Sequence, residues 1–195
     1  MSDPQAFIFF GASGSGKGTQ AKLLLEYLEK KNRKAIHIET GQKVREFIAS
    51  DDSYTSVLTK HVIDHGGLLP VFVPIWLWTE VLNKDFTGKE DLILDGVCRR
   101  VPEAPVLDSV MKFYKLQKPI VISLNVSDKW AEERLKSRGR TDDVAKYVKS
   151  RLDWFKKDVV PAIEYFRDNP DYIFLDVNGE KSIEEVHENI VSHIS

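Results

Sequence analysis

The glycine-rich segment GASGSGKGT, residues 11–19, contains the residue types that hold a phosphate group. It follows an apolar run at residues 6–10 and precedes a helical pattern, which is the order of strand, loop and helix that a phosphate-binding loop requires. Backbone N–H groups at the start of a helix attract anions, and the ammonium group of Lys17 adds a positive charge. A dinucleotide-binding fingerprint would need a third glycine where Thr19 stands. The alternative is a glycine turn that binds no ligand.

Gly18 departs from the general form of this loop, G-x-x-x-x-G-K-[S/T]. In that form a hydroxyl group directly follows the lysine and reaches Mg²⁺. Here Gly18 follows Lys17, and the hydroxyl residue Thr19 comes one position later. The general motif alone does not explain this glycine.

Asp95 is a second candidate for chemistry, because it ends the apolar run at residues 92–94 and is followed by Gly96. Ligands of open α/β sheets bind at the carboxyl ends of the strands. The position therefore favours a role in a site, and the alternative is an ordinary polar residue that ends a strand.

Short apolar runs alternate with helical patterns along the chain. The runs are nearly all apolar, which is typical of parallel strands buried on both faces. Their order predicts right-handed crossovers and an α/β fold with a doubly wound, five-stranded parallel sheet. We expect strands over residues 6–10, 35–38, 92–94, 120–125 and 172–175, and helices over residues 19–31, 77–82, 106–116, 129–136, 144–169 and 182–194.

The composition of the 195 residues is that of an ordinary globular domain, with 42% hydrophobic and 30% charged residues. A formal net charge of −2 gives no overall attraction to nucleic acid or to an anionic membrane, so an anionic ligand must be held locally. A single cysteine, Cys98, excludes an internal disulfide, and we expect no structural zinc. We find neither a signal peptide nor a membrane-spanning segment, which makes the protein cytoplasmic by expectation.

Four segments, in order, resemble the adenylate kinase and nucleoside monophosphate kinase family in its short-lid form. The loop reads GSGKGTQ, and on this resemblance Gly18 is a feature of the family. The other segments are HIETGQKVREFI, LILDGVCRRVPEA, and ERLKSRGRTDD followed by KSRL. The resemblance runs from about residue 7 to about residue 176 and implies a P-loop NTPase type of fold. It implies one kinase domain, with a core of residues 1–39, 67–137 and 141–195, a helical monophosphate-binding insert at 40–66 and a very short lid at 138–140.

The resemblance implies Mg²⁺-dependent phosphoryl transfer from ATP to a nucleoside monophosphate. Such a transfer needs positioned cations and little acid–base chemistry. The implied catalytic residues are Lys17, Arg99, Arg138, Arg140 and Arg151. ATP would contact Ser13, Gly14, Ser15, Gly16, Lys17, Gly18, Thr19 and Arg134. The monophosphate would contact Thr40, Gly41, Arg45, Leu69, Gly96, Arg99 and Glu103. Mg²⁺ would be held by Thr19 and Asp95, largely through water, and the lid arginines would be supported by Asp142 and Asp143. For Arg134 and Arg151 the alternative is a simple exposed helix charge.

The chain departs from the family pattern at several positions. Cys98 stands where proline is usual, so the turn that aims Arg99 is expected to be built differently. A single residue, Gly139, separates the two lid arginines, which makes the lid minimal. We expect a monomer, and a dimer through the apolar residues 71–78 is the alternative.

Glu103 is the departure that bears on the substrate, because the adenylate kinase pattern has glutamine there. A carboxylate accepts hydrogen bonds and donates none, so it suits the N–H groups of guanine better than N1 of adenine. Against this, Thr40 and Leu69 resemble the adenylate branch. The expected function is an adenylate kinase, ATP + AMP = 2 ADP. The alternatives are a kinase for GMP or another monophosphate, and a catalytically weak nucleotide-binding module.

Overall fold

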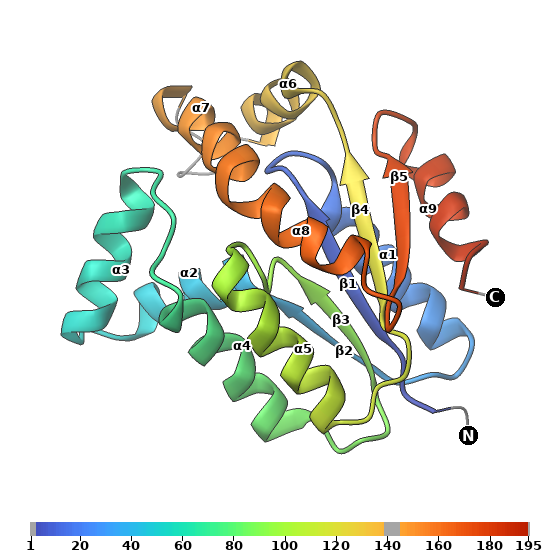
Figure 1. Ribbon diagram of the computed structural model, residues 1–195. Coiled ribbons are helices and arrows are strands. Elements are labelled where there is room, and N and C mark those ends of the chain that lie inside the picture. Colours follow the sequence, from blue (N-terminus) through green and yellow to red (C-terminus); the bar gives the residue numbers. More distant parts are fainter. Residues whose placement is uncertain (1–2, 139–144, 195) are drawn as a thin grey trace.

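A computed structural model describes residues 3–138 and 145–194, and a five-stranded parallel sheet forms its centre (Figure 1). The strand order is β2-β3-β1-β4-β5, and each neighbouring pair is parallel. This confirms the predicted doubly wound α/β class. The strands are β1 (Ala6–Gly11), β2 (Ala35–Glu39), β3 (Asp91–Asp95), β4 (Ile120–Asn125) and β5 (Ile173–Asn178).

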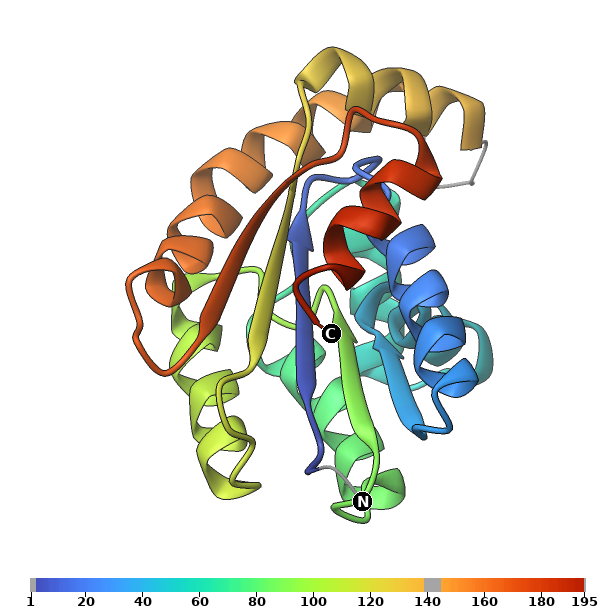
Figure 2. The same cartoon turned by 90° about the vertical axis from the view of Figure 1, so that its right-hand side faces the viewer.

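Helices cover both faces of the sheet (Figure 2). Side chains alternate between the two faces along β1, so that Ile8 packs in the core beneath one set of helices and Phe9 in the core beneath the other. Because both faces are buried, the central strands have the continuous apolar runs that predicted them. One face carries α1 (Lys17–Lys30) and α9 (Ile183–Val191), and the other carries α4 (Phe72–Asp85), α5 (Ala104–Phe113) and α8 (Val160–Arg167).

The sequence pattern predicts the wrong boundaries for two helical segments, and each of them contains a proline. A helix was expected over residues 77–82, but α4 begins at Phe72, because Pro74 lies in the first turn, where a missing N–H costs nothing. A single helix was expected over residues 144–169. The structure has α7 (Ala145–Trp154), a π-helical turn η2 (Phe155–Val159) and then α8, whose second residue is Pro161. Pro161 has no backbone N–H to donate to the preceding turn, and the helix takes the wider π-helical form where that hydrogen bond is missing.

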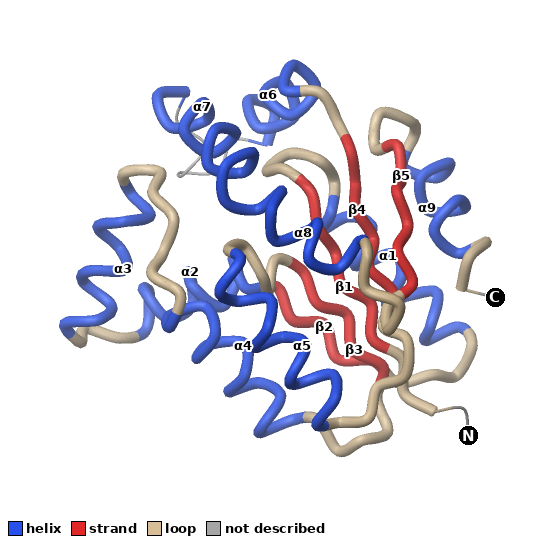
Figure 3. The backbone as a smooth tube through the Cα atoms, in the orientation of Figure 1, coloured by secondary structure: helices blue, strands red, loops and turns tan. Residues whose placement is uncertain are grey.

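Two further helices, α2 (Thr40–Ser50) and α3 (Tyr54–Asp64), occupy the segment after β2, to one side of the sheet (Figure 3). Across the upper end of the sheet lie α6 (Asp128–Arg138) and α7. The lid residues Arg140, Asp142 and Asp143 fall outside the described residues. Within the described part of the chain, no helix combines the length and apolar character that crossing a membrane requires.

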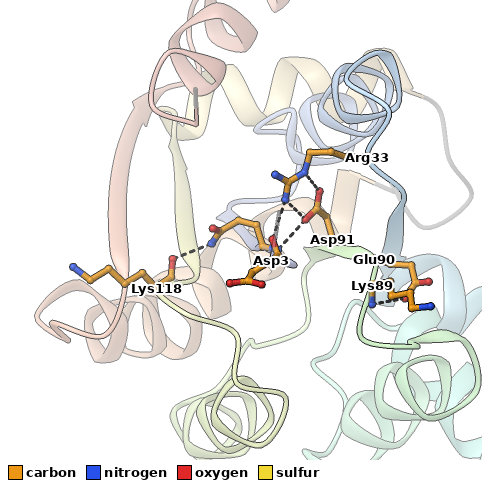
Figure 4. A network of polar contacts seen from close by, with 7 residues as sticks. Asp3, Arg33, Lys89, Glu90, Asp91 and Lys118 are labelled. Carbon is orange, nitrogen blue, oxygen red and sulfur yellow. Dashed lines mark hydrogen bonds and ion pairs between the residues drawn. The ribbon is translucent and has the colours of Figure 1, made fainter. Parts of the chain in front are cut away.

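The lower end of the sheet is joined by a polar network around Asp91, the first residue of β3 (Figure 4). The Asp91 side chain is 3% exposed. Its carboxylate accepts hydrogen bonds from Nε of Arg33 at 2.6 Å, from Nη2 of Arg33 at 2.5 Å, and from the backbone N–H of Gln5 at 2.8 Å. Three segments distant in sequence are thereby held together at the end of the sheet opposite α6 and α7.

Candidate active site

A cavity of about 660 Å³ opens at the carboxyl ends of the parallel strands, where α/β sheets bind their ligands. The loop before α1, the start of α2, the turn after α3, and parts of α6 and α7 line it. Most of the predicted site residues lie here: Ser13, Gly14, Ser15, Gly16, Lys17, Gly18, Thr19, Thr40, Gly41, Arg45, Leu69, Asp95, Arg99, Glu103, Arg134 and Arg151.

The glycine-rich loop wraps around the ammonium group of Lys17. Its Nζ donates to the carbonyl oxygen of Gly11 at 2.7 Å and of Ala12 at 2.9 Å. Gly14 has a φ of 86°, and a Cβ there would lie 2.5 Å from the carbonyl oxygen of Ala131 in α6. The loop can therefore pass this close to α6 only with glycine at position 14. The result is a helix N-terminus with a fixed positive charge, which is a site for anions.

Gly18 lies next to the Asp95 carboxylate, and both residues line the cavity. A Cβ on Gly18 would lie 3.5 Å from Oδ2 of Asp95, so a hydroxyl side chain at this position would abut that carboxylate. Asp95 is 6% exposed at the carboxyl end of β3. Burial raises the pKa of Asp95, and the positive charge of Lys17 partly offsets this effect.

Three arginines from different elements reach the same cavity. Arg45 comes from α2, Arg99 from the turn after β3, and Arg151 from α7. Nη2 of Arg151 lies 3.1 Å from Oγ of Ser13 in the glycine-rich loop. Burial lowers the pKa of Arg99, the negative charges of Asp95 and Glu103 oppose this shift, and the smaller effects of Arg151 and Arg45 add to it. Such a concentration of positive charge is stabilised by an anionic ligand.

The sequence model of the adenylate kinase family matches residues 9–170. The chain belongs to the adenylate kinase family. Its relatives include Adenylate kinase 1 of Synechocystis sp., 35% identical over 191 residues with 97% of each chain covered, and Adenylate kinase 1 of Nostoc sp., 34% identical over 179 residues with 92% of each covered. Adenylate kinase of Corynebacterium aurimucosum is 31% identical over 182 residues, which cover 93% of this chain and 94% of that one. The family is one of phosphotransferases.

In this member of the adenylate kinase family, Glu103 holds the turn that carries Arg99. Glu103 is 1% exposed, and its Oε2 accepts the backbone N–H of Arg99 at 2.8 Å. Nη2 of Arg100 donates to the carbonyl oxygen of Leu68 at 3.2 Å and ties the turn to the segment after α3. These contacts hold the turn that contains Cys98. Burial raises the pKa of Glu103, and the Arg99 N–H opposes the shift.

Cys98 itself is a packing residue. It is 1% exposed within the core beneath α4, α5 and α8. Burial raises the pKa of its thiol far above the usual value, so little reactive thiolate forms at neutral pH.

The remaining predicted residues differ in what the structure shows of them. Gly96 has a φ of 70°, and a Cβ there would lie 3.0 Å from Nη2 of Arg99, so this glycine makes room for the guanidinium group. The guanidinium carbon of Arg134 lies 4.8 Å from the centre of the Trp130 ring, a cation–π contact at the cavity. The backbone of Arg138 ends α6, and its side chain is outside what the structure describes.

Sequence reasoning missed three residues at this site. It placed neither Trp130 nor Trp154 at the site, and both line the cavity. It gave no role to Glu39, the last residue of β2, which lines the cavity and forms an ion pair with Arg45. The sequence does contain a signal for Glu39, because an acidic residue ends β2 as Asp95 ends β3. Whether the two side chains lie together depends on how the two strands align.

The chemistry of these side chains fits Mg²⁺ brought in with a nucleotide. Among the described residues, no cluster of three or more histidine, cysteine or acidic side chains could hold a metal ion. Mg²⁺ typically takes one or two carboxylates, and waters and substrate phosphates complete its coordination. The buried carboxylate of Asp95, in the same cavity as Thr19 and Lys17, meets that requirement.

Proposed function

We propose that this chain is an adenylate kinase that transfers the terminal phosphoryl group of ATP to AMP and yields two ADP. The observation that carries the proposal is the convergence of four cationic side chains on one cavity that also holds a buried carboxylate. The cations are Lys17, Arg45, Arg99 and Arg151, and the carboxylate is that of Asp95.

The reaction breaks the bond between the γ-phosphorus of ATP and its bridging oxygen, and forms a bond from that phosphorus to a phosphate oxygen of AMP. Charge spreads over the equatorial oxygens in the transition state, so catalysis is mainly positioning and electrostatic stabilisation. Lys17 and the loop amides would hold the donor phosphates, and Arg45 and Arg99 the acceptor phosphate. Arg151, which contacts the loop at Ser13, would bridge the two.

Mg²⁺ would supply charge neutralisation on the ATP phosphates, with Asp95 and Thr19 as the residues that hold it. The site is formed by side chains of one chain, so the proposal requires no second subunit. We therefore propose a monomer whose partners are ATP and AMP.

The GMP alternative rests on Glu103, and the geometry gives it little support. One carboxyl oxygen of Glu103 already accepts the Arg99 N–H, so the side chain has a structural role that is independent of the base. Thr40, which lines the same cavity, is buried, and its Oγ1 has no hydrogen-bond partner among the described residues.

A coupled phosphoryl-transfer assay tests the proposal, with Mg·ATP and each of AMP, GMP, CMP and UMP in parallel. We expect turnover with AMP to exceed that with the other acceptors, and two ADP to appear for each AMP consumed. A preference for GMP would refute the proposed acceptor. Bound ATP without transfer to any acceptor would refute the enzyme and favour the nucleotide-binding module. A reaction without acceptor measures wasteful ATP hydrolysis, which the short lid would increase.

A further inference from the structure

A carboxylate lies among the cations of the acceptor side of the cavity. Glu39 ends β2 and aligns with Asp95, which ends the neighbouring strand β3. Its side chain is 17% exposed, and its Oε1 accepts a hydrogen bond from Nη2 of Arg45 at 2.9 Å. The Arg45 side chain is 41% exposed, so its guanidinium group can exchange this partner for another.

The geometry around Gly41 shows how close Glu39 is to the cation cluster. A Cβ built on Gly41 would lie 3.3 Å from Nη1 of Arg45, 3.8 Å from Nη2 of Arg99 and 3.8 Å from Oε1 of Glu39. Two guanidinium groups and one carboxylate therefore converge on the first turn of α2. Nearby charges include Asp95, whose raised pKa has a contribution from Glu39, and the partly buried His37 on β2.

This arrangement affects the binding of a phosphate. An anion that binds Arg45 and Arg99 approaches the negative charge of Glu39, and like charges at short range in a partly buried site repel. Before the anion arrives, Glu39 already neutralises part of the charge of Arg45. The phosphate must then share or replace a hydrogen bond that the protein has made internally.

We propose that Glu39 is a resident counter-anion of the acceptor site, which the phosphate of the nucleoside monophosphate displaces from Arg45. The inference rests on the proposed function, because it takes Arg45 and Arg99 as the acceptor clamp. Glu39 lowers the affinity for the acceptor and leaves the affinity for ATP unchanged, since the donor phosphates are held by the loop around Lys17. It thereby determines the monophosphate concentration at which the site fills.

The opposite role for Glu39 is to orient Arg45 for the acceptor. In that case its removal would weaken acceptor binding. The sign of the change in acceptor affinity therefore decides between displacement and orientation.

The variant Glu39→Gln tests the inference, because it removes the negative charge of the side chain. It keeps the shape of the side chain and an oxygen that can accept the hydrogen bond from Arg45. The control is Glu46→Gln, which removes one charge from the same helix as Arg45 at an exposed residue paired with Lys43. AMP affinity is measured by calorimetry with a non-hydrolysable ATP analogue in the donor site, and KM for AMP and for ATP by the coupled assay. Glu39→Ser serves as a second variant if the glutamine variant does not fold.

We expect Glu39→Gln to tighten AMP binding and lower KM for AMP by roughly three- to tenfold, the effect of one partly exposed charge. In Glu39→Gln, KM for ATP should change less than about twofold. In the control Glu46→Gln, the affinity for AMP and both KM values should also change less than about twofold, the limit for a surface charge. Unchanged or weaker AMP binding in Glu39→Gln would overturn the inference, even if the wild type is an active adenylate kinase. Tighter AMP binding with no transfer in any variant would support the role of Glu39 and refute the proposed function.

Discussion

The ammonium group of Lys17 is placed before any nucleotide arrives, because two loop carbonyls accept its hydrogen bonds. A cation held in this way needs little reorganisation when charge develops on a transferring phosphoryl group. Electrostatic stabilisation by preorganised groups is commonly the largest contribution to such catalysis. Lys17 is therefore the side chain whose loss should affect the reaction most directly.

For Lys17→Met we expect transfer to AMP to fall by about 100-fold or more, since the variant removes a preorganised charge and retains most of the side-chain volume. The coupled assay measures the change, and circular dichroism confirms that the variant is folded. Lys30→Met, at the exposed end of the same helix, is the matched control and should keep wild-type activity. Full activity in Lys17→Met would show that the site has been assigned wrongly.

Glu103 is an acidic side chain in a buried position, and this makes its contribution to stability depend on pH. Burial raises its pKa in the folded state above the ordinary value of 4.5. The folded chain thus binds this proton more tightly than the unfolded chain. The resulting stabilisation is complete below the unfolded-state pKa and is lost as the pH rises through the raised folded-state pKa.

We expect Glu103→Gln to raise the melting temperature at pH 8, and to raise it less at pH 4, because the amide carries no charge and still offers an oxygen to the Arg99 N–H. Thermal unfolding across this pH range measures the difference. Glu90→Gln is a control of opposite sign, since the backbone N–H of Thr87 lowers the pKa of the partly exposed Glu90 and the ionised form stabilises the fold. A Glu103→Gln variant that is less stable at pH 8 would contradict the prediction.

Residues of the site could be predicted where the chemistry lies in a contiguous motif. Lys17 and Asp95 are of this kind. A glycine-rich loop precedes Lys17 and an apolar run precedes Asp95, and each identifies the end of a strand. Glu39 could not be predicted, because its proximity to Arg45 and Asp95 depends on strand register and on the path of α2. The structural role of Glu103 could not be predicted for a similar reason, since every residue other than proline has a backbone N–H and the sequence does not show which one a side chain binds.

Between elements, the turn after α3 makes a close contact with α7. Gly66 has a φ of 67°, and a Cβ there would lie 2.6 Å from Cβ of Tyr147 and 3.1 Å from Oγ of Ser150. Gly66 lines the cavity, as does Arg151 one residue beyond Ser150. The contact therefore joins the turn after α3 to the helix that supplies Arg151.

Gly66→Ala should push α7 away and displace Arg151, and we expect kcat/KM for transfer to fall roughly 10- to 100-fold, as for a misplaced catalytic group. Gly88→Ala is the matched control, because Gly88 also has a positive φ, 83°, but nothing lies within 4 Å of the position of its Cβ. Each substitution should cost about 1–2 kcal/mol of stability through backbone strain. Equal activity in the two variants would show that the contact with α7 does not position Arg151.

The extent of the elements was predictable where apolar periodicity was uninterrupted. The central strands agree with expectation to within a residue or two, because burial on both faces gives them a clear pattern. The prolines caused the errors. The helix expected over residues 77–82 begins before Pro74, which lies in its first turn, and the π-helical turn before Pro161 cannot be derived from side-chain spacing.

Across the whole molecule, the cavity and the polar network around Asp91 lie at opposite ends of the sheet. The cavity lies at the carboxyl ends of the strands, and the network around Asp91 lies at the amino end of β3. Because the ends are separated by the length of the strands, a change in the network should act on folding and leave the ligand site intact.

Asp91→Asn should reduce the free energy of unfolding by about 1–3 kcal/mol, because it leaves the partly exposed Arg33 without its anionic partner in a mostly buried pair. KM for AMP and ATP at 25 °C should remain at wild-type values. Urea unfolding and the coupled assay measure the two effects. Asp85→Asn, at an exposed position near the end of α4, should change neither. A large change in KM with unchanged stability would contradict this separation.

The placement of the four tryptophans gives the protein an intrinsic optical reporter. Trp130 and Trp154 line the cavity, and the indole Nε1 of Trp154 is buried with no hydrogen-bond partner among the described residues. Trp78 lies in the core with 0% exposure, and Trp76 lies on the outer surface of α4. A nucleotide that enters the cavity changes the polarity around two indoles and leaves the core indole unaltered. Emission intensity and wavelength should then follow occupancy in real time on the unlabelled protein, so that binding and release can be timed separately from the chemical step.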